Sequence, residues 1–230
     1  MFMTAIDLET TALAQEHAFY TQTLGLPLRQ EGADSFTVQA GTTALTFRAS
    51  RKPPLLYHFA FTIPLNKWQQ AKAWLRARTT LLEGEGEDEF ESERVRSRSY
   101  YFPDPAGNIL EFIAREDLPA KAGEDFGPGD VLHISELGLV VHDVPSLANQ
   151  LKTSLGVEVF RDSFFEDFAQ LGDINGVLVL TQRERLWFPD RRQPAVVSPV
   201  RVAMLGTLPQ QITVQPYPYV LEVVPLREEG

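Results

Sequence analysis

The feature that most constrains the fold is an internal repeat. Residues 5–30 form a short alternating segment, a helical stretch, and a Leu-Gly-Leu sequence at 24–26 that leads into a strand. Residues 136–161 repeat this order, with Leu-Gly-Val at 155–157. Gly after a helical stretch indicates a helix end, and the two short apolar segments that follow each copy indicate a hairpin. Each unit is therefore strand, helix and hairpin, and such a unit buries its apolar face against a neighbour.

Two more units complete the pattern. One begins at residues 57–79, where apolar residues alternate and then recur at helical spacing, and it ends in a hairpin at 96–115. The last, at 198–225, has strands but no room for a full helix. The acidic segment 83–93 has no apolar periodicity, which favours a solvated, mobile loop over a cation site.

The repeat predicts an α+β fold with two tandem domains. Paired units would form a first domain at residues 1–116 and a degenerate, truncated second domain at residues 131–226. Residues 117–130 are rich in Pro, Gly and Asp, which is typical of a linker.

Composition excludes several function classes. The net charge of −10 opposes binding to nucleic acid, because that affinity depends on Lys and Arg. The sequence has no Cys, so disulfides and thiolate metal sites are excluded. No apolar stretch reaches the roughly 20 residues that a membrane helix needs, and the first residues lack the pattern of a signal peptide. We therefore expect a cytoplasmic protein without nucleic-acid or membrane partners.

An acid inside an apolar strand gives the first indication of a site. In "YFPDPAGNILEF", residues 101–112, a turn containing Pro, Gly and Asn leads into a strand in which Leu110 and Phe112 share one face and Glu111 lies on the other. This motif and the repeated units resemble the vicinal oxygen chelate superfamily, which includes glyoxalases, extradiol dioxygenases and bleomycin resistance proteins. The resemblance implies paired βαβββ modules that form curled, mostly antiparallel sheets around a cavity.

The resemblance also implies metal ligands on the first and last strands of each unit. His58 and Glu111 occupy two such positions. The equivalent positions of the first unit are Ala5 and Thr46, neither of which is a usual metal ligand, and Asp7 is a weak substitute. Two ligands are fewer than the three that catalytic metal sites generally have.

The corresponding positions in the second domain are Glu136, Val179, Arg201 and Glu222. Arg has no lone pair for a metal and stays charged. We therefore predict an ion cluster in which Arg201 pairs with Glu136, Glu222 or both, and no metal in this domain.

Two functions remain open. In the first, the N-terminal domain binds a small molecule without turning it over, with metal weak or absent, and Thr46, Tyr57 and Tyr101 contact the ligand; pleat parity allows only one of Tyr100 and Tyr101 to face inward. In the alternative, His58 and Glu111 hold Fe, Mn, Zn or Ni in a lyase, isomerase or dioxygenase that acts on a small substrate with vicinal oxygens. The basic, aromatic segment 182–194 is interpreted as a solvated loop, and a homodimer stays open.

Overall fold

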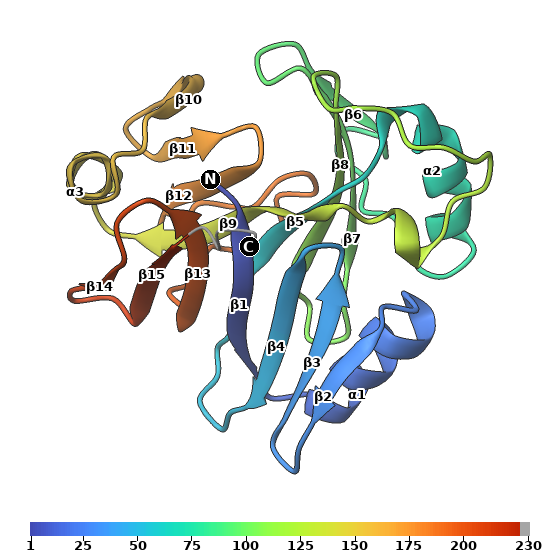
Figure 1. The fold of residues 1–230 in the computed structure, drawn as a ribbon, viewed down its shortest axis with the longest axis horizontal. Coiled ribbons are helices and arrows are strands. Elements are labelled where there is room, and N and C mark those ends of the chain that lie inside the picture. Colours follow the sequence, from blue (N-terminus) through green and yellow to red (C-terminus); the bar gives the residue numbers. More distant parts are fainter. Residues whose placement is uncertain (226–230) are drawn as a thin grey trace.

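The computed structural model describes residues 1–225, which form two curled sheets (Figure 1). The first, sheet A, has the strand order β14 (Gln210–Val214), β15 (Tyr219–Pro225), β13 (Val200–Gly206), β1 (Met3–Thr10), β4 (Thr43–Ala49), β3 (Ser35–Ala40) and β2 (Leu28–Glu31). The second, sheet B, has the order β10 (Val159–Phe164), β11 (Phe168–Asp173), β12 (Gly176–Gln182), β9 (His133–Val141), β5 (His58–Thr62), β8 (Ile109–Arg115), β7 (Ser97–Pro103) and β6 (Phe90–Ser92).

Three helices flank the sheets. The first begins as α1 (Leu13–Ala18) and continues as a π-helix (Phe19–Thr23). The others are α2 (Trp68–Arg76) and α3 (Val144–Leu155), with 3-10 turns at Leu65–Lys67 and Pro128–Asp130. The described part of the last unit contains three strands and no helix, as predicted. Parallel pairs such as β1–β4 and β5–β8 are fewer than antiparallel ones, so the predicted fold class is confirmed.

Strand pairing across the repeats differs from the order that the sequence suggested. Strand β1 pairs antiparallel with β13, so the first and fourth units share sheet A. Strand β5 pairs antiparallel with β9, so the second and third units share sheet B. Alternation defines the buried face of a strand but not its neighbour, so the alternation pattern could not reveal that the first unit pairs with the fourth and the second with the third. The bounds 1–116 and 131–226, as separately folding domains, stay a prediction, and residue 226 lies outside the described part.

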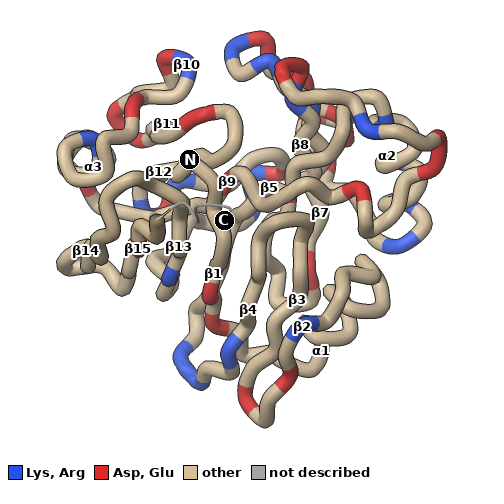
Figure 2. The backbone as a smooth tube through the Cα atoms, in the orientation of Figure 1, with Lys and Arg blue, Asp and Glu red and all other residues tan. Residues whose placement is uncertain are grey.

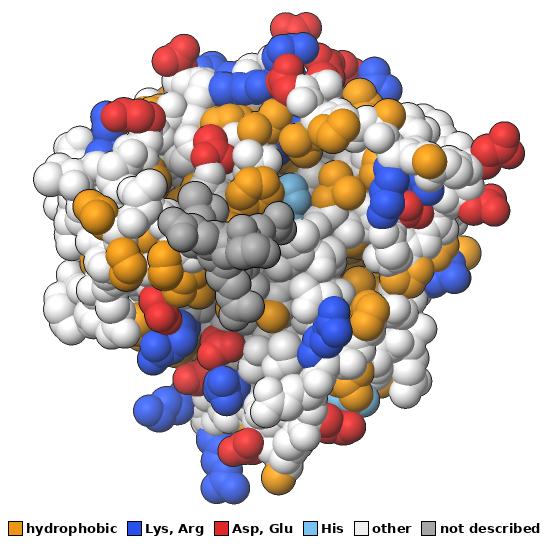
Figure 3. Space-filling view, in the orientation of Figure 1, with side chains coloured by type: hydrophobic (Ala, Val, Ile, Leu, Met, Phe, Trp, Pro, Cys, Tyr) orange, Lys and Arg blue, Asp and Glu red, His pale blue; other side chains and the backbone are white. Residues whose placement is uncertain are grey.

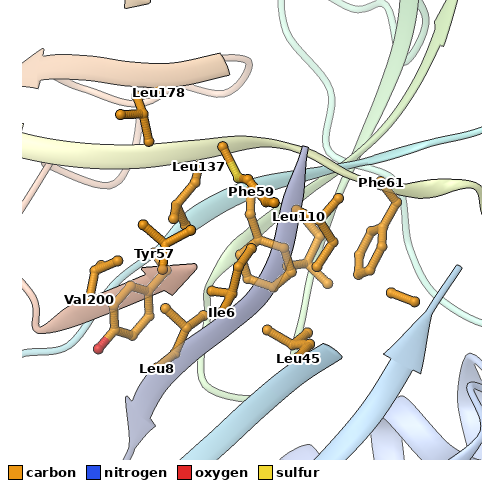
Figure 4. Packing of buried hydrophobic residues seen from close by; sticks show 14 of the residues in the cluster. Ile6, Leu8, Leu45, Tyr57, Phe59, Phe61, Leu110, Leu137, Leu178 and Val200 are labelled. Carbon is orange, nitrogen blue, oxygen red and sulfur yellow. The ribbon is translucent and has the colours of Figure 1, made fainter. Parts of the chain in front are cut away.

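The core lies between the two sheets. Phe59, Leu110 and Leu137 of sheet B point toward Ile6 and Leu45 of sheet A (Figure 4), and all five side chains are fully buried. Burial of side chains of this size stabilises a fold by about 1.5–3 kcal/mol each. Because these residues occupy one face of each strand, the residues of opposite parity in sheet B are left to line its concave face.

The segment interpreted as a linker, 117–130, and the segment interpreted as a solvated loop, 83–93, both contact the rest of the fold. Within 117–130, Phe126 is buried against Phe112 and Trp74. Glu89 of the acidic segment accepts hydrogen bonds from Trp68 Nε1 at 2.8 Å and Lys72 Nζ at 2.7 Å. Glu89 is therefore bound by two donors on α2, although its side chain stays 32% exposed.

Charge is spread around the molecule. Lys and Arg lie next to Asp and Glu at loops and strand ends in Figure 2. None of the described helices is long and apolar enough to cross a membrane.

The turn in the Asp-Pro-Ala-Gly-Asn motif encloses two buried carboxyl groups. Asp104 accepts hydrogen bonds from Tyr20 Oη at 2.8 Å and from the Asn108 backbone at 2.9 Å. Glu16 of α1 accepts one from the Ala106 backbone at 2.8 Å. Burial, and then the charge of Asp104, raise the pKa of Glu16 from 4.5 to about 9. Glu16, which belongs to the first unit, thus binds the turn through its carboxyl group, and the raised pKa favours the protonated form of that group.

Glu16→Gln is expected to stabilise the protein increasingly as pH rises from 4.5 toward 9. The folded pKa lies above the unfolded one, so the wild-type contribution is fully present below 4.5 and is lost as pH rises through that window. The amide imitates the protonated acid, so the gain near the top of the window should be about 1 kcal/mol or more. Urea unfolding at both ends of the window measures it. An equal stability difference at both ends would contradict the prediction.

Candidate functional site

Three ligand-type side chains meet on the concave face of sheet B. His58 comes from β5, Glu111 from β8 and Glu136 from β9, and one donor atom from each lies within 4.8 Å of the others. Ala60 is the register partner of both glutamates. Because its methyl group is small, the carboxylates can approach each other across the central strand.

The hydrogen bond of His58 determines which ring nitrogen faces the cluster. Nδ1 lies 3.0 Å from the carbonyl oxygen of Ile109, which can only accept, so Nδ1 carries the proton. The lone pair of Nε2 then points toward Glu111 Oε2, 3.5 Å away. Burial lowers the pKa of His58 below its usual 6.5, so the ring is neutral.

Glu111 is fully buried next to His58 and Glu136. Ser99 Oγ donates a short hydrogen bond to its Oε1. Burial, and then the charge of Glu136, raise the pKa of Glu111 from 4.5 to about 8. The Nε2 lone pair of His58 and two carboxylates face one another, so a positive species between them is favoured. A proton on Glu111 satisfies two of the three groups, and a divalent cation would satisfy all three.

Glu136 has a cationic partner behind the cluster. Arg115 Nη2 donates to its Oε1 at 2.5 Å, and the guanidinium lies 5.2 Å from the ring of Phe160. Only 1% of Arg115 is exposed. Its Nε and Nη1 have no acceptor among the described residues. A fully buried guanidinium is therefore compensated by a single carboxylate.

A cavity of about 370 Å³ opens beside the cluster. Polar side chains lie near the cluster, and aromatic rings form much of the wall, namely Phe90, Tyr101, Phe165, Phe168, Trp187 and Phe188. Hydrophobic side chains gather between the β10–β11 and β6–β8 ends of the sheet in Figure 3. The interior thus suits a small, mainly apolar molecule.

Trp187 forms the wall next to His58, with ring centroids 5.1 Å apart. The ring of Tyr101 stacks 6.2 Å from the same imidazole. Gly138 on β9 lets the indole lie against the sheet, because a Cβ there would be 2.9 Å from Trp187 Cη2. The segment 182–194, interpreted as a solvated loop, therefore contributes a buried side chain to the cavity.

The predicted site residues divide into two groups. His58, Glu111 and Tyr101 line the cavity, and Tyr100 instead packs on Trp68 beneath α2. The structure does not bring Thr46 or Tyr57 to it. Their contacts are with Thr37 Oγ1 and the Pro199 carbonyl oxygen, respectively. Metal binding by His58 and Glu111 and ligand binding by Thr46, Tyr57 and Tyr101 stay predictions.

The predicted ion cluster around Arg201 is wrong. Arg201 is exposed and forms no salt bridge with any residue of the described chain, and Glu136 pairs with Arg115 instead. For Glu136 the reason is the strand order, because β13 joins β1 in sheet A while Glu136 lies on β9 in sheet B. Glu222 lies on β15, next to β13, but it forms no salt bridge with Arg201 in the described structure. Glu136 was recognised as a ligand-type position, but it was assigned to the other domain.

Several solved structures share the fold. A candidate dioxygenase from Bacillus subtilis has a TM-score of 0.61 and 17% identity, over 98% of this chain and 85% of that one. Two glyoxalase I variants from Zea mays have TM-scores of 0.60 and 0.58 and identities of 14% and 15%, each over 97% of this chain and over 93% and 92% of theirs. The chain therefore has a glyoxalase-like fold, as the motif at 101–112 predicted. No protein-family model matches the chain, and no curated protein matches it in sequence.

Proposed function

We propose that His58, Glu111 and Glu136 hold one divalent metal ion beside a cavity that binds a small, mainly apolar molecule with two neighbouring oxygen atoms. The reaction would be that of a lyase, an isomerase or a dioxygenase. The observation that carries the proposal is the closeness of three ligand atoms, within 4.8 Å of one another, on the cavity wall.

The donor set suits such an ion. Three protein ligands leave coordination positions for a substrate, and one imidazole with two carboxylates suits Fe, Mn, Zn or Ni. The Nε2 lone pair of His58 faces Glu111. The other ring nitrogen, Nδ1, bonds to the Ile109 carbonyl oxygen, and metal-binding histidines are typically oriented by such a hydrogen bond. A bound ion would supply Lewis-acid stabilisation of negative charge on the substrate oxygens.

The surrounding residues would orient and desolvate the substrate. Ser99 fixes one oxygen of Glu111, which leaves the other facing His58. Tyr101 and Trp187 flank the imidazole and exclude water from one side of the cluster. A dry site strengthens every electrostatic contact that the substrate makes.

A metal-free binding protein is the second candidate. It is favoured by Arg115, which already compensates the charge of Glu136, and by the raised pKa of Glu111, which allows its carboxyl group to donate to His58. In this case the cavity binds its ligand through the aromatic wall, and no ion takes part.

Metal-induced stabilisation separates the two candidates. Added Mn(II), Ni(II) or Zn(II) should raise the melting temperature of wild type, because an ion at about 100 times its Kd adds about 2.7 kcal/mol. That gain corresponds to roughly 5–10 °C for a protein of this size. His58→Ala, Glu111→Gln and Glu136→Gln should each remove the shift.

Glu222→Gln is the matched control, because Glu222 occupies the corresponding last-strand position of sheet A. Its melting temperature should respond to the ions as wild type does. Absence of any shift in wild type, together with stabilisation by small aromatic molecules, would favour the metal-free candidate.

A further inference from the structure

We propose that Arg115 sets the charge of the site so that a divalent ion and a singly charged anion with two neighbouring oxygens bind cooperatively, each increasing the affinity for the other. This inference rests on the metal site proposed above. In this role Arg115 is a positioning residue, and the ligand of the cavity is a monoanion.

Three charged side chains are buried together at the site. When both carboxylates are ionised, Glu111, Glu136 and the Arg115 guanidinium leave one net negative charge. A divalent ion would change this to one net positive charge in a site where all three residues are at most 4% exposed. An uncompensated buried charge is costly, so the ion alone should bind weakly. A singly charged anion in the same site would restore neutrality.

The charge of Arg115 cannot be removed by deprotonation, since guanidinium stays protonated in proteins. It is also not neutralised elsewhere, because Glu136 is its only ionic partner among the described residues. Cation–π contact with Phe160, 5.2 Å away, holds the guanidinium behind the cluster.

Other charged residues of the cavity do not change this balance. Glu91 and Arg94 are exposed, so solvent screens them. Arg185 pairs with Asp167 at 2.9 Å. The buried balance is therefore decided by Arg115 and the two carboxylates.

The test compares an anion with its neutral analogue. Mandelate carries an aromatic ring, a hydroxyl and a carboxylate, and mandelamide has the same shape without the charge. Calorimetric titration of wild type should show that mandelate increases the affinity for Mn(II) about tenfold, which is a typical size for coupling between two ligands. Mandelamide should increase this affinity much less. By reciprocity, Mn(II) should increase mandelate affinity by the same factor.

Variants separate charge from geometry. Arg115→Met should bind Mn(II) alone about tenfold more tightly than wild type and lose most of the effect of mandelate. Arg115→Lys keeps the positive charge and should retain the increase in Mn(II) affinity that mandelate causes. It also provides a test if Arg115→Met does not fold. Arg98→Met is the control, because that side chain is 42% exposed and its charge is screened.

Two results would overturn the inference while leaving the metal site intact: equal effects of mandelate and mandelamide on Mn(II) affinity in wild type, or Arg115→Lys behaving like Arg115→Met. If neither wild type nor Arg115→Met binds Mn(II) with either compound, the proposed metal site fails, and the inference fails with it.

Discussion

Alanine in place of Gly41 is expected to lower the free energy of unfolding by at least about 3 kcal/mol. Gly41 has φ of +58°, and a methyl group there would overlap the carbonyl oxygens of Val131 and Leu132. The next residue, Thr42, donates its backbone N–H to Leu132 at 2.9 Å, so the turn cannot move away without losing that bond. Urea unfolding measures the change.

Gly86→Ala is the matched control for the backbone conformation. Gly86 has φ of +86°, but a Cβ there would meet nothing within 4 Å. It should therefore cost only the roughly 1–2 kcal/mol of a left-handed conformation. If the two substitutions lowered the free energy of unfolding equally, the contact with Leu132 would contribute nothing to the effect at Gly41.

Trp187→Ala is expected to cost about 3–5 kcal/mol, the usual range for a buried tryptophan. The side chain is 4% exposed, and it packs with Leu56, Ile109 and Val140. The substitution also removes the wall beside His58, so affinity for small aromatic molecules should fall more than tenfold, or by more than about 1.4 kcal/mol. Thermal unfolding and calorimetric titration with an aromatic probe measure the two effects.

Leu186→Ala is the control in the same loop, because Leu186 is 46% exposed. Its effect on stability should stay within about 0.5 kcal/mol, as expected for a surface position. Unchanged ligand affinity in Trp187→Ala would mean that the indole supports the loop without contacting the ligand.

The sequence predicted the local elements and two of the three side chains of the cluster, His58 and Glu111. Alternation around Glu111 and around His58 placed both side chains on the concave face, because pleat parity follows directly from spacing. Tyr101 faced the cavity for the same reason, two residues from Ser99 on β7.

Glu136 and Arg115 could not be placed from sequence. Their meeting depends on β9 lying beside β5, and strand neighbours are decided by long-range packing that no local pattern encodes. Arg115 is the last residue of β8, and only the tertiary structure shows its side chain reaching Glu136. The position of Trp187 in the cavity wall was not predicted, because nothing in the short polar segment around it distinguishes an inward-facing indole from an exposed one.

The pairing of β1 with β13 also has a consequence for the order of folding. Thr4 Oγ1 donates to the carbonyl oxygen of Ala203, a separation of 199 residues along the chain. Contacts this distant form slowly because a long loop must close first. During synthesis, β1 leaves the ribosome long before its partner exists, and its edge remains open until β13 has emerged. We therefore expect the nascent chain to depend on chaperones that shield this strand until translation is nearly complete.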